Sequence, residues 1–124
     1  SGGIVCPLID YEIGVYTIGN LIKDLNMSVI IVAGAGLGTI NHTVLTAKYI
    51  ENLGIKIKGI IINKYEEDLF YDDNIEMIEK ITQLPIIGRL EYIKGMDDEY
   101  IEAIRISSEK AFNAENIIEY MEQL

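Results

Sequence analysis

Short apolar runs rich in isoleucine and valine alternate along this chain with segments whose apolar residues recur at helical spacing. The clearest runs are residues 28–33 (Ser-Val-Ile-Ile-Val-Ala) and 56–63 (Lys-Ile-Lys-Gly-Ile-Ile-Ile-Asn). Such near-continuous β-branched runs are typical of strands buried on both faces, whereas strands with one face in water alternate polar and apolar residues. This feature constrains the fold most, because buried strands separated by helices favour a parallel sheet covered by helices.

The predicted order is β-α-β-α-β-α-β-α, a doubly wound, mostly parallel sheet flanked by helices within one partial α/β domain, residues 1–124. The expected elements are strands at 4–9, 28–33, 56–63 and 85–90, and helices at 18–25, 39–53, 74–83, 98–106 and 107–122. Thr17 is the expected N-cap of the first helix, Gly54 ends the second, and Pro7 places the end of the first strand. Ligands in such sheets bind beyond the carboxyl ends of the strands, which singles out the loops 33–38, 63–73 and 89–97.

A net charge of −10 limits the partners that this chain can bind. Nucleic-acid phosphates require clustered Lys and Arg, so no nucleic-acid partner is expected. The single cysteine, Cys6, cannot form an internal disulfide, which fits a reducing compartment. No apolar run approaches the roughly 20 residues that span a bilayer, and no signal peptide is visible. We therefore expect a cytoplasmic protein without a membrane partner.

The candidate binding loop is the glycine-rich stretch 34–38 (Gly-Ala-Gly-Leu-Gly), which leaves a predicted strand and opens a predicted helix. Glycines permit tight turns and close approach of a ligand, and the first N–H groups of a helix attract a carboxylate or phosphate. The spacing differs from the dinucleotide pattern Gly-x-Gly-x-x-Gly, and no Gly-Lys-Ser/Thr of a Walker A loop occurs in the chain. The residues alone leave two interpretations open, an anion-binding loop and a plain strand-to-helix turn.

The single histidine and the acidic residues between positions 66 and 73 are weaker candidates for catalysis or metal binding than the glycine-rich loop. His42, the single histidine, lies on the first turn of the predicted helix, but no carboxylate accompanies it in the motif. We expect a structural role for it rather than general-base catalysis. The acidic residues between positions 66 and 73 lack EF-hand spacing, so a solvated loop is expected there.

A resemblance to a known family narrows these interpretations. Residues 38–43 (Gly-Thr-Ile-Asn-His-Thr), with Leu45 and Thr46 shortly after them, resemble the Gly-x-Ile-Asn-His stretch of dethiobiotin synthetases. Residues 1–3 (Ser-Gly-Gly) are similar to the tail of that family's Glu-Gly-Ala/Ser-Gly-Gly motif. Residues 84–88 (Leu-Pro-Ile-Ile-Gly) resemble the strand before its base-binding loop. These matches run in order through most of the chain, and they resemble the C-terminal half of the family.

The resemblance implies an ATP-dependent ligase with a P-loop NTPase-like fold. Such an enzyme joins 7,8-diaminononanoate and CO2 through a carbamate and a carbamic-phosphoric anhydride, using ATP and Mg²⁺, and gives dethiobiotin, ADP and phosphate. The family's Walker A loop, catalytic lysine and magnesium carboxylates lie upstream of Ser1, so no catalytic residue or metal ligand is expected here, and this piece alone should be inactive. Two alternatives stay open: another P-loop ligase of the cobyrinic acid synthetase group, and a non-catalytic α/β interaction domain.

The resemblance also assigns binding residues. Those implied for the nucleotide are Gly2, Gly3, Asn63, Lys64, Glu91, Tyr92 and Ile93. Those implied for the diamino acid are Gly38, Thr39, Asn41 and Tyr71. The Asn63 amide can offer a donor and an acceptor to the adenine edge, and Tyr92 can pack on the base, with Glu91 where the family has proline. The helix that starts at Gly38 serves the partner subunit's site in the family, so a homodimer is implied.

Overall fold

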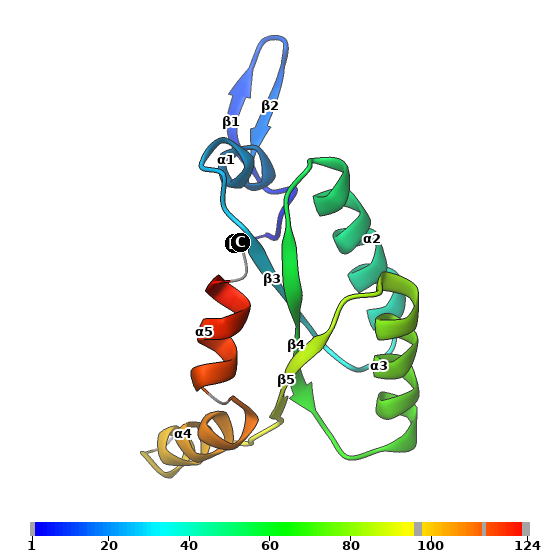
Figure 1. Ribbon diagram of the computed structural model, residues 1–124, viewed down its shortest axis with the longest axis vertical. Helices are drawn as coiled ribbons and strands as arrows, with labels where there is room; N and C mark the ends of the chain where they lie inside the picture. The colour runs from blue at the N-terminus through cyan, green and yellow to red at the C-terminus, as the bar shows by residue number, and fades with distance from the viewer. Residues whose placement is uncertain (1, 96–97, 113, 123–124) are drawn as a thin grey trace.

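The computed structural model describes residues 2–95, 98–112 and 114–122 (Figure 1). In chain order its elements are β1 (Pro7–Tyr11), β2 (Gly14–Thr17), α1 (Ile18–Asp24), β3 (Val29–Ala33), α2 (Thr39–Asn52), β4 (Ile57–Tyr65), α3 (Leu69–Thr82), β5 (Ile86–Glu91), α4 (Asp98–Ala111) and α5 (Ala114–Glu122). The strands β3, β4 and β5 form a parallel sheet in that order, and β1 and β2 form a separate antiparallel hairpin. The parallel sheet and its flanking helices confirm the predicted α/β class.

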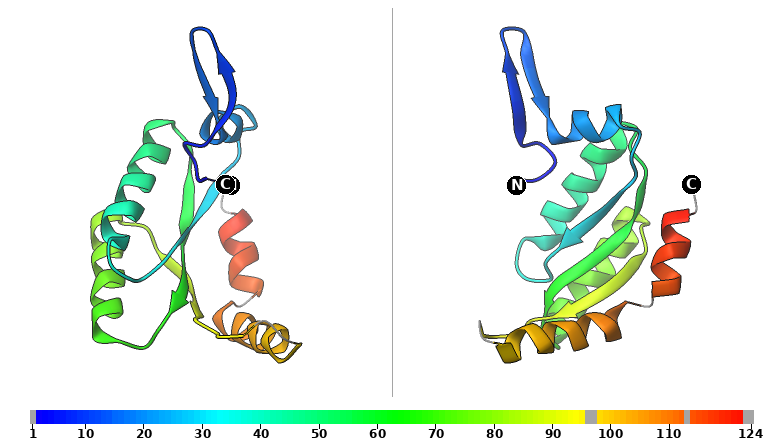
Figure 2. Two further views of the ribbon diagram at one scale, coloured as in Figure 1. Left: turned by 180° about the vertical axis from the view of Figure 1, so that it is seen from behind. Right: turned by 90° about the vertical axis from the view of Figure 1, so that its left-hand side faces the viewer.

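The core of the sheet lies beneath α2 and α3, which run side by side along one face (Figures 1 and 2). Ile60 and Ile62 of β4 are fully buried there, because alternate side chains of a strand point to the same face. Ile75 and Ile78 of α3 are buried against them, and Ala47 of α2 belongs to the same cluster. Each buried isoleucine contributes roughly 1.5–3 kcal/mol, so this layer fixes α2 and α3 on the sheet.

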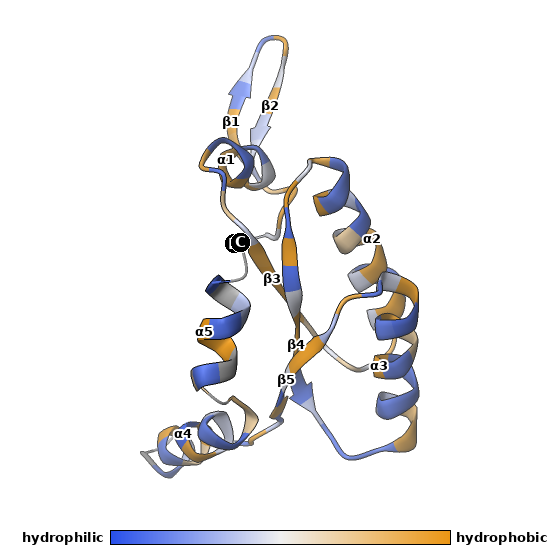
Figure 3. Cartoon of the chain, viewed as in Figure 1, coloured by the Kyte–Doolittle hydropathy of each residue, from blue (hydrophilic) through white to orange (hydrophobic). Residues whose placement is uncertain are grey.

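The opposite face of the sheet is more open than the sequence predicts. Val32 of β3 points away from the core and is 63% exposed. α5 lies on this side of the sheet (Figure 1), and the strands are built largely of apolar residues (Figure 3). Among the described strands β3 pairs only with β4, so its other edge is free. The sheet is therefore well packed on the α2–α3 side and only partly covered on the other.

Two helix ends follow the rules from which they were predicted. The Thr17 hydroxyl accepts a hydrogen bond from the Asn20 N–H at 3.3 Å, and the Thr17 N–H donates to the Asn20 side chain at 2.8 Å. This reciprocal pair is a capping box that starts α1. Gly54 has a φ of +78°, the left-handed conformation that ends α2.

The first predicted strand, 4–9, is wrong in both position and pairing. Pro7 begins β1 rather than ending it, and β1 pairs antiparallel with β2 outside the parallel sheet (Figure 1). Proline has no N–H to donate, and the first residue of a strand is a position where that loss is tolerated. Before it, the Cys6 N–H bonds to the Gly3 carbonyl at 3.0 Å and closes a turn. The apolar run therefore leads into a hairpin instead of a buried strand.

Two further boundaries differ from the predictions. The expected acidic loop is shorter, because α3 begins at Leu69 with Asp68 as its N-cap, and the Asp68 carboxylate accepts from the Phe70 N–H at 2.7 Å. Acidic residues stabilise a helix start, so part of this acidic stretch is helical rather than a loop. The expected break after residue 106 is absent, since α4 continues to Ala111. The Ser108 hydroxyl donates to the Ile104 carbonyl at 2.8 Å, which satisfies it inside the helix.

Candidate functional site

The carboxyl end of β4 departs from regular strand geometry. The register of β4 against β5 shifts between Ile62 and Tyr65, which leaves Asn63 and Lys64 outside the regular ladder. Lys64 has a φ of +56°, and its N–H donates to the Asn63 side-chain oxygen at 2.9 Å. A left-handed non-glycine residue costs on the order of 1–3 kcal/mol, and such strain clusters at binding sites. A register shift of this kind also changes the direction of the side chains that follow it.

A pocket of about 250 Å³ lies beside this irregularity, and we name it the α4 pocket. Its lining residues are Asn63, Lys64, Leu90, Glu91, Tyr92, Ile93, Tyr100, Ile104, Ser107 and Ser108. The two strand ends are joined here, because the Tyr92 N–H donates to the Tyr65 carbonyl at 2.9 Å. The structure thus brings together Asn63 and Lys64 with residues 91–93, as expected for one ligand site beyond the strand ends.

Helix α4 closes this pocket, and a glycine of β5 decides how closely it approaches. A Cβ on Gly88 would lie 2.3 Å from a ring carbon of Phe112, the residue that follows α4. Real Cβ atoms do not approach that closely, so only glycine lets the Phe112 ring rest on β5. α4 crosses the carboxyl end of the sheet in Figures 1 and 2. The Gly88–Phe112 contact therefore holds α4 over the ends of β4 and β5.

Three side chains connect the α4 pocket to α3. The Tyr65 hydroxyl donates to the Asp72 carboxylate at 3.0 Å, and Arg89 forms an ion pair with the same oxygen at 3.1 Å. The Arg89 guanidinium also lies 5.6 Å from the centre of the Tyr65 ring. The hydrogen bond to Asp72 raises the pKa of Tyr65, with burial as a second cause. This cluster ties the strand ends to the first turns of α3.

The glycine-rich loop after β3 is held by two hydrogen bonds from side chains. Gly38 has a φ of +84° and is the N-cap of α2, without a side chain to cap the first N–H groups. Thr39 is 7% exposed, and its hydroxyl donates to the Gly34 carbonyl. The buried Asn74 of α3 donates its side-chain N–H to the Ala35 carbonyl at 2.9 Å. The loop is therefore pinned from both helices, and no side chain caps the start of α2.

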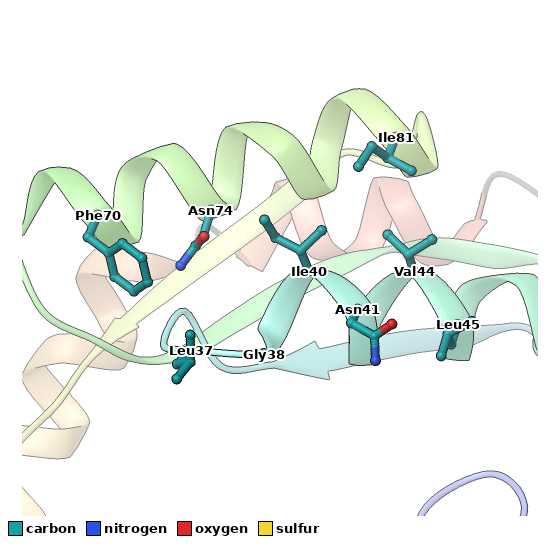
Figure 4. A pocket seen from close by; sticks show the side chains of 9 residues that line it. All are labelled: Leu37, Gly38, Ile40, Asn41, Val44, Leu45, Phe70, Asn74 and Ile81. Atoms are coloured by element: carbon teal, nitrogen blue, oxygen red, sulfur yellow. The ribbon is translucent and has the colours of Figure 1, made fainter.

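A second pocket, of about 500 Å³, lies between α2 and α3 (Figure 4), and we name it the inter-helix pocket. Its lining residues are Leu37, Gly38, Ile40, Asn41, Val44, Leu45, Phe70, Asn74 and Ile81. In Figure 4 Ile40 and Val44 point from α2 toward α3, and Phe70 points toward the loop that carries Leu37. The lining is mostly aliphatic, with two amide side chains, Asn41 and Asn74. It suits an apolar chain with a polar end.

The residues implied for the diamino acid divide between two surroundings. Gly38 and Asn41 line the inter-helix pocket, whereas the Thr39 side chain is buried and its hydroxyl is engaged. Tyr71 is half-buried, and its hydroxyl would lie 3.9 Å from a Cβ built on Gly36. Tyr71 therefore lies against the glycine-rich loop, next to the pocket but not in its lining.

Gly2 and Gly3 lie apart from the α4 pocket. Gly3 has a φ of +91° and lines a shallow trough along the free edge of β3, together with Ile4, His42 and Thr43. Gly2 and Cys6 are close neighbours, since a Cβ on Gly2 would lie 3.4 Å from the Cys6 sulfur. The structure thus does not gather Gly2 and Gly3 with the other residues implied for the nucleotide.

The sequence prediction missed the α4 wall of the α4 pocket. Tyr100, Ile104 and Ser107 recur at a spacing of one helix face, and this periodicity was the available signal. Within the described ranges no three His, Cys, Asp or Glu side chains form a metal-binding group. In the same ranges no helix is long and apolar enough to cross a membrane.

The family described as an AAA domain matches residues 8–100, and the chain belongs to this family.

Its relatives among curated proteins carry a more specific name. The chain is similar to the ATP-dependent dethiobiotin synthetase BioD of Clostridium kluyveri, 83% identical over 124 residues, which cover 100% of this chain and 52% of that protein. It is similar to the protein of that name from Clostridium acetobutylicum, 48% identical over 124 residues, again 100% of this chain and 52% of the relative. The Clostridium novyi protein of that name is 50% identical over 95 residues, 76% of this chain and 40% of its own length. The chain spans about half the length of the curated relatives that it matches.

Proposed function

We propose that this chain is the C-terminal half of an ATP-dependent dethiobiotin synthetase. One observation carries the proposal: Asn63, Lys64 and residues 91–93, which the resemblance assigns to the nucleotide, all line the single α4 pocket. The 83% identity to a protein of that name over the whole chain supports the same activity. The full-length enzyme would join 7,8-diaminononanoate and CO2 with hydrolysis of ATP to ADP and phosphate, in biotin biosynthesis.

The α4 pocket suits the base of the nucleotide. Its volume of about 250 Å³ is below the ~300–1,000 Å³ of pockets for larger ligands, so it accommodates one ring system rather than a whole nucleotide. Asn63 supplies an amide for the base edge, and Tyr92 supplies an aromatic face. The phosphates and Mg²⁺ would be held by the Walker A loop and carboxylates of the other half, because this chain contains no Gly-Lys-Ser/Thr.

The inter-helix pocket suits the diamino acid. Its aliphatic lining matches the hydrocarbon chain, and the open helix start at Gly38, with Asn41 beside it, suits the carboxylate. Carbamate formation, attack on the γ-phosphate and ring closure need the two amines and the phosphate aligned, which is chiefly positioning. Within this chain the contribution is specificity, through Gly38, Asn41 and the neighbouring Tyr71.

The same proposal includes a homodimer in the cytoplasm. Leu37 and Leu45 at the mouth of the inter-helix pocket are 94% and 60% exposed, and a partner subunit would cover them. The lone Cys6 fits a reducing compartment. Light scattering of the full-length protein checks the assembly, and a monomer at micromolar concentration would contradict it.

The deciding experiment is dethiobiotin formation by the full-length protein with ATP, Mg²⁺, bicarbonate and 7,8-diaminononanoate, with the product identified by mass. Appearance of dethiobiotin only when all four are present supports the proposal. ATP binding without dethiobiotin would contradict the substrate and favour another P-loop ligase, such as the cobyrinic acid synthetase group. Absence of ATP binding would favour a non-catalytic interaction domain.

A further inference from the structure

The wall that α4 contributes to the α4 pocket is not assigned by the resemblance or by any relative's name. Its members are Tyr100, Ile104, Ser107 and Ser108. They lie on one face of α4, and the Gly88–Phe112 contact holds that helix over the strand ends. The α4 pocket therefore has a strand wall, which carries Asn63, and a helix wall that faces the same small space.

The two serines on this wall differ in their hydrogen bonds. The Ser108 hydroxyl donates to the Ile104 carbonyl at 2.8 Å, so its proton is committed within the helix. The Ser107 hydroxyl makes no hydrogen bond to the part of the chain that the structure describes, although the residue is half-buried and lines the pocket. A serine hydroxyl can donate one hydrogen bond and accept two, so Ser107 can both donate to a ligand and accept from it, whereas Ser108 can only accept.

The strand wall alone does not fix the orientation of a bound ring. The Asn63 side-chain oxygen already accepts from the Lys64 N–H at 2.9 Å, so its amide N–H₂ is the freer half of the group. One amide orients a planar ring poorly, because a ring held at one edge can pivot. Binding pockets fix orientation through a few polar groups that converge on an otherwise apolar space. A second polar contact from the opposite wall would fix the ring.

We propose that the Ser107 hydroxyl hydrogen bonds the base of the nucleotide in the α4 pocket and is a specificity-determining residue for ATP. This inference rests on the proposed function, because it requires a nucleotide base in that pocket. Ser107 on α4 and Asn63 on β4 then hold the ring from two sides.

The test compares Ser107→Ala with the control Ser28→Ala in the full-length protein, because Ser28 is half-buried like Ser107 but lines neither the α4 pocket nor the inter-helix pocket. Dissociation constants for ATP and for inorganic triphosphate, which has no base, are measured by calorimetry, together with the KM for ATP and kcat. Ser107→Ala should weaken ATP binding by about fivefold to tenfold with kcat unchanged, the scale of one lost hydrogen bond. Triphosphate binding should be unchanged, and Ser28→Ala should match the wild type within about twofold. Ser107→Thr, which keeps a hydroxyl, should restore most of the ATP affinity.

The outcomes separate this inference from the proposed function. If the wild type forms dethiobiotin but Ser107→Ala binds ATP as tightly as Ser28→Ala does, the serine contact is wrong and the function stands. If Ser107→Ala weakens ATP and triphosphate equally, the effect is not at the base, and the inference is also overturned. If the wild type binds no ATP, both fail. Thermal unfolding of each variant confirms that the comparison is between folded proteins.

Discussion

The α4 pocket and the inter-helix pocket lie in the same small domain but are built by different means. The α4 pocket is about half the volume of the inter-helix pocket, about 250 against 500 Å³. Its walls come from the ends of β4 and β5 and from α4, and they mix amide, hydroxyl, charged and aromatic groups. The inter-helix pocket is made by two helices and a glycine-rich loop, with a mostly aliphatic lining (Figure 4).

The two pockets are therefore held in shape by different structural features. The α4 pocket depends on irregular backbone, the left-handed Lys64, and on one close contact at Gly88. The inter-helix pocket depends on helix packing and on the hydrogen bond from Asn74 to the Ala35 carbonyl. A change at one set of residues should therefore damage one ligand's binding and spare the other's. Substitutions that disturb one pocket at a time test that independence.

The largest effect is expected at Gly88. In Gly88→Ala the new Cβ would lie 2.3 Å from the Phe112 ring, so the ring and α4 must move away from β5. Overpacking of this kind costs roughly 1–3 kcal/mol of stability, and the opened α4 pocket should lose at least tenfold in ATP affinity. Thermal unfolding and ATP titration of the full-length protein measure both, and the KM for 7,8-diaminononanoate should change less than about twofold.

Two variants make this prediction specific. Gly88→Ala combined with Phe112→Ala removes the clash and should recover part of the ATP affinity. Gly34→Ala is the steric control, since a Cβ there meets nothing within 4 Å and stability should hold. An ATP affinity of Gly88→Ala equal to that of the wild type would show that α4 does not shape the pocket.

The next largest effect is expected at Asn74. Asn74→Ala removes the hydrogen bond to the Ala35 carbonyl at a buried position, which costs about 1–3 kcal/mol. The glycine-rich loop would then be less well fixed beside the start of α2. We expect a higher KM for the diamino acid and an unchanged dissociation constant for ATP. If ATP affinity falls as much as substrate affinity, the two pockets are not independent.

Smaller effects on ligand affinity are expected from replacing one asparagine in each pocket. Asn63→Ala should weaken ATP binding by about tenfold and leave the KM for the diamino acid unchanged, because its amide lies in the α4 pocket. Asn41→Ala should do the reverse, because Asn41 lines the inter-helix pocket. Each variant is the control for the other, and a pair that affects both ligands alike would contradict the assignment.

The parts of this fold that the sequence predicts are those set by local patterns. The buried runs at 28–33 and 56–63 became β3 and β4 because continuous β-branched residues suit a parallel sheet. Thr17 and Gly54 marked helix ends because capping depends on adjacent residues. The hairpin was missed because Pro7 is compatible with the start of a strand as well as with its end. The start of α3 was missed because Asp68 acts as a cap in a stretch expected to be a loop.

In the candidate site, too, some residues could be predicted from the sequence and others depend on long-range contacts. The resemblance pointed to Asn63 and to residues 91–93, and the parallel topology accounts for their meeting at one edge. The α4 wall is a long-range feature that depends on Gly88 accepting Phe112, and no local pattern records that contact. The left-handed Lys64 was likewise invisible, since lysine has no preference for that conformation.

The smallest effect is expected at Tyr65, which ties the end of β4 to α3 through its hydrogen bond to Asp72. The hydrogen bond to Asp72 raises the pKa of Tyr65 above the ordinary 10.0, so the folded state favours the protonated phenol. The bond therefore stabilises the fold fully below pH 10.0 and is lost as the pH rises through the higher folded-state pKa. Tyr65→Phe should unfold at a slightly lower temperature than the wild type at pH 8, and this difference should shrink above pH 10.

Tyr16→Phe is the matched control, because Tyr16 donates to Asp24 at 2.6 Å and has a raised pKa for the same reason, far from either pocket. Both variants should show the same pH dependence, but only Tyr65→Phe should also change ATP and substrate affinity, because only Tyr65 ties β4 to α3. A Tyr65→Phe variant that changes neither affinity would show that the strand ends and α3 hold their places without this cluster, and that the two pockets are independent in the full sense.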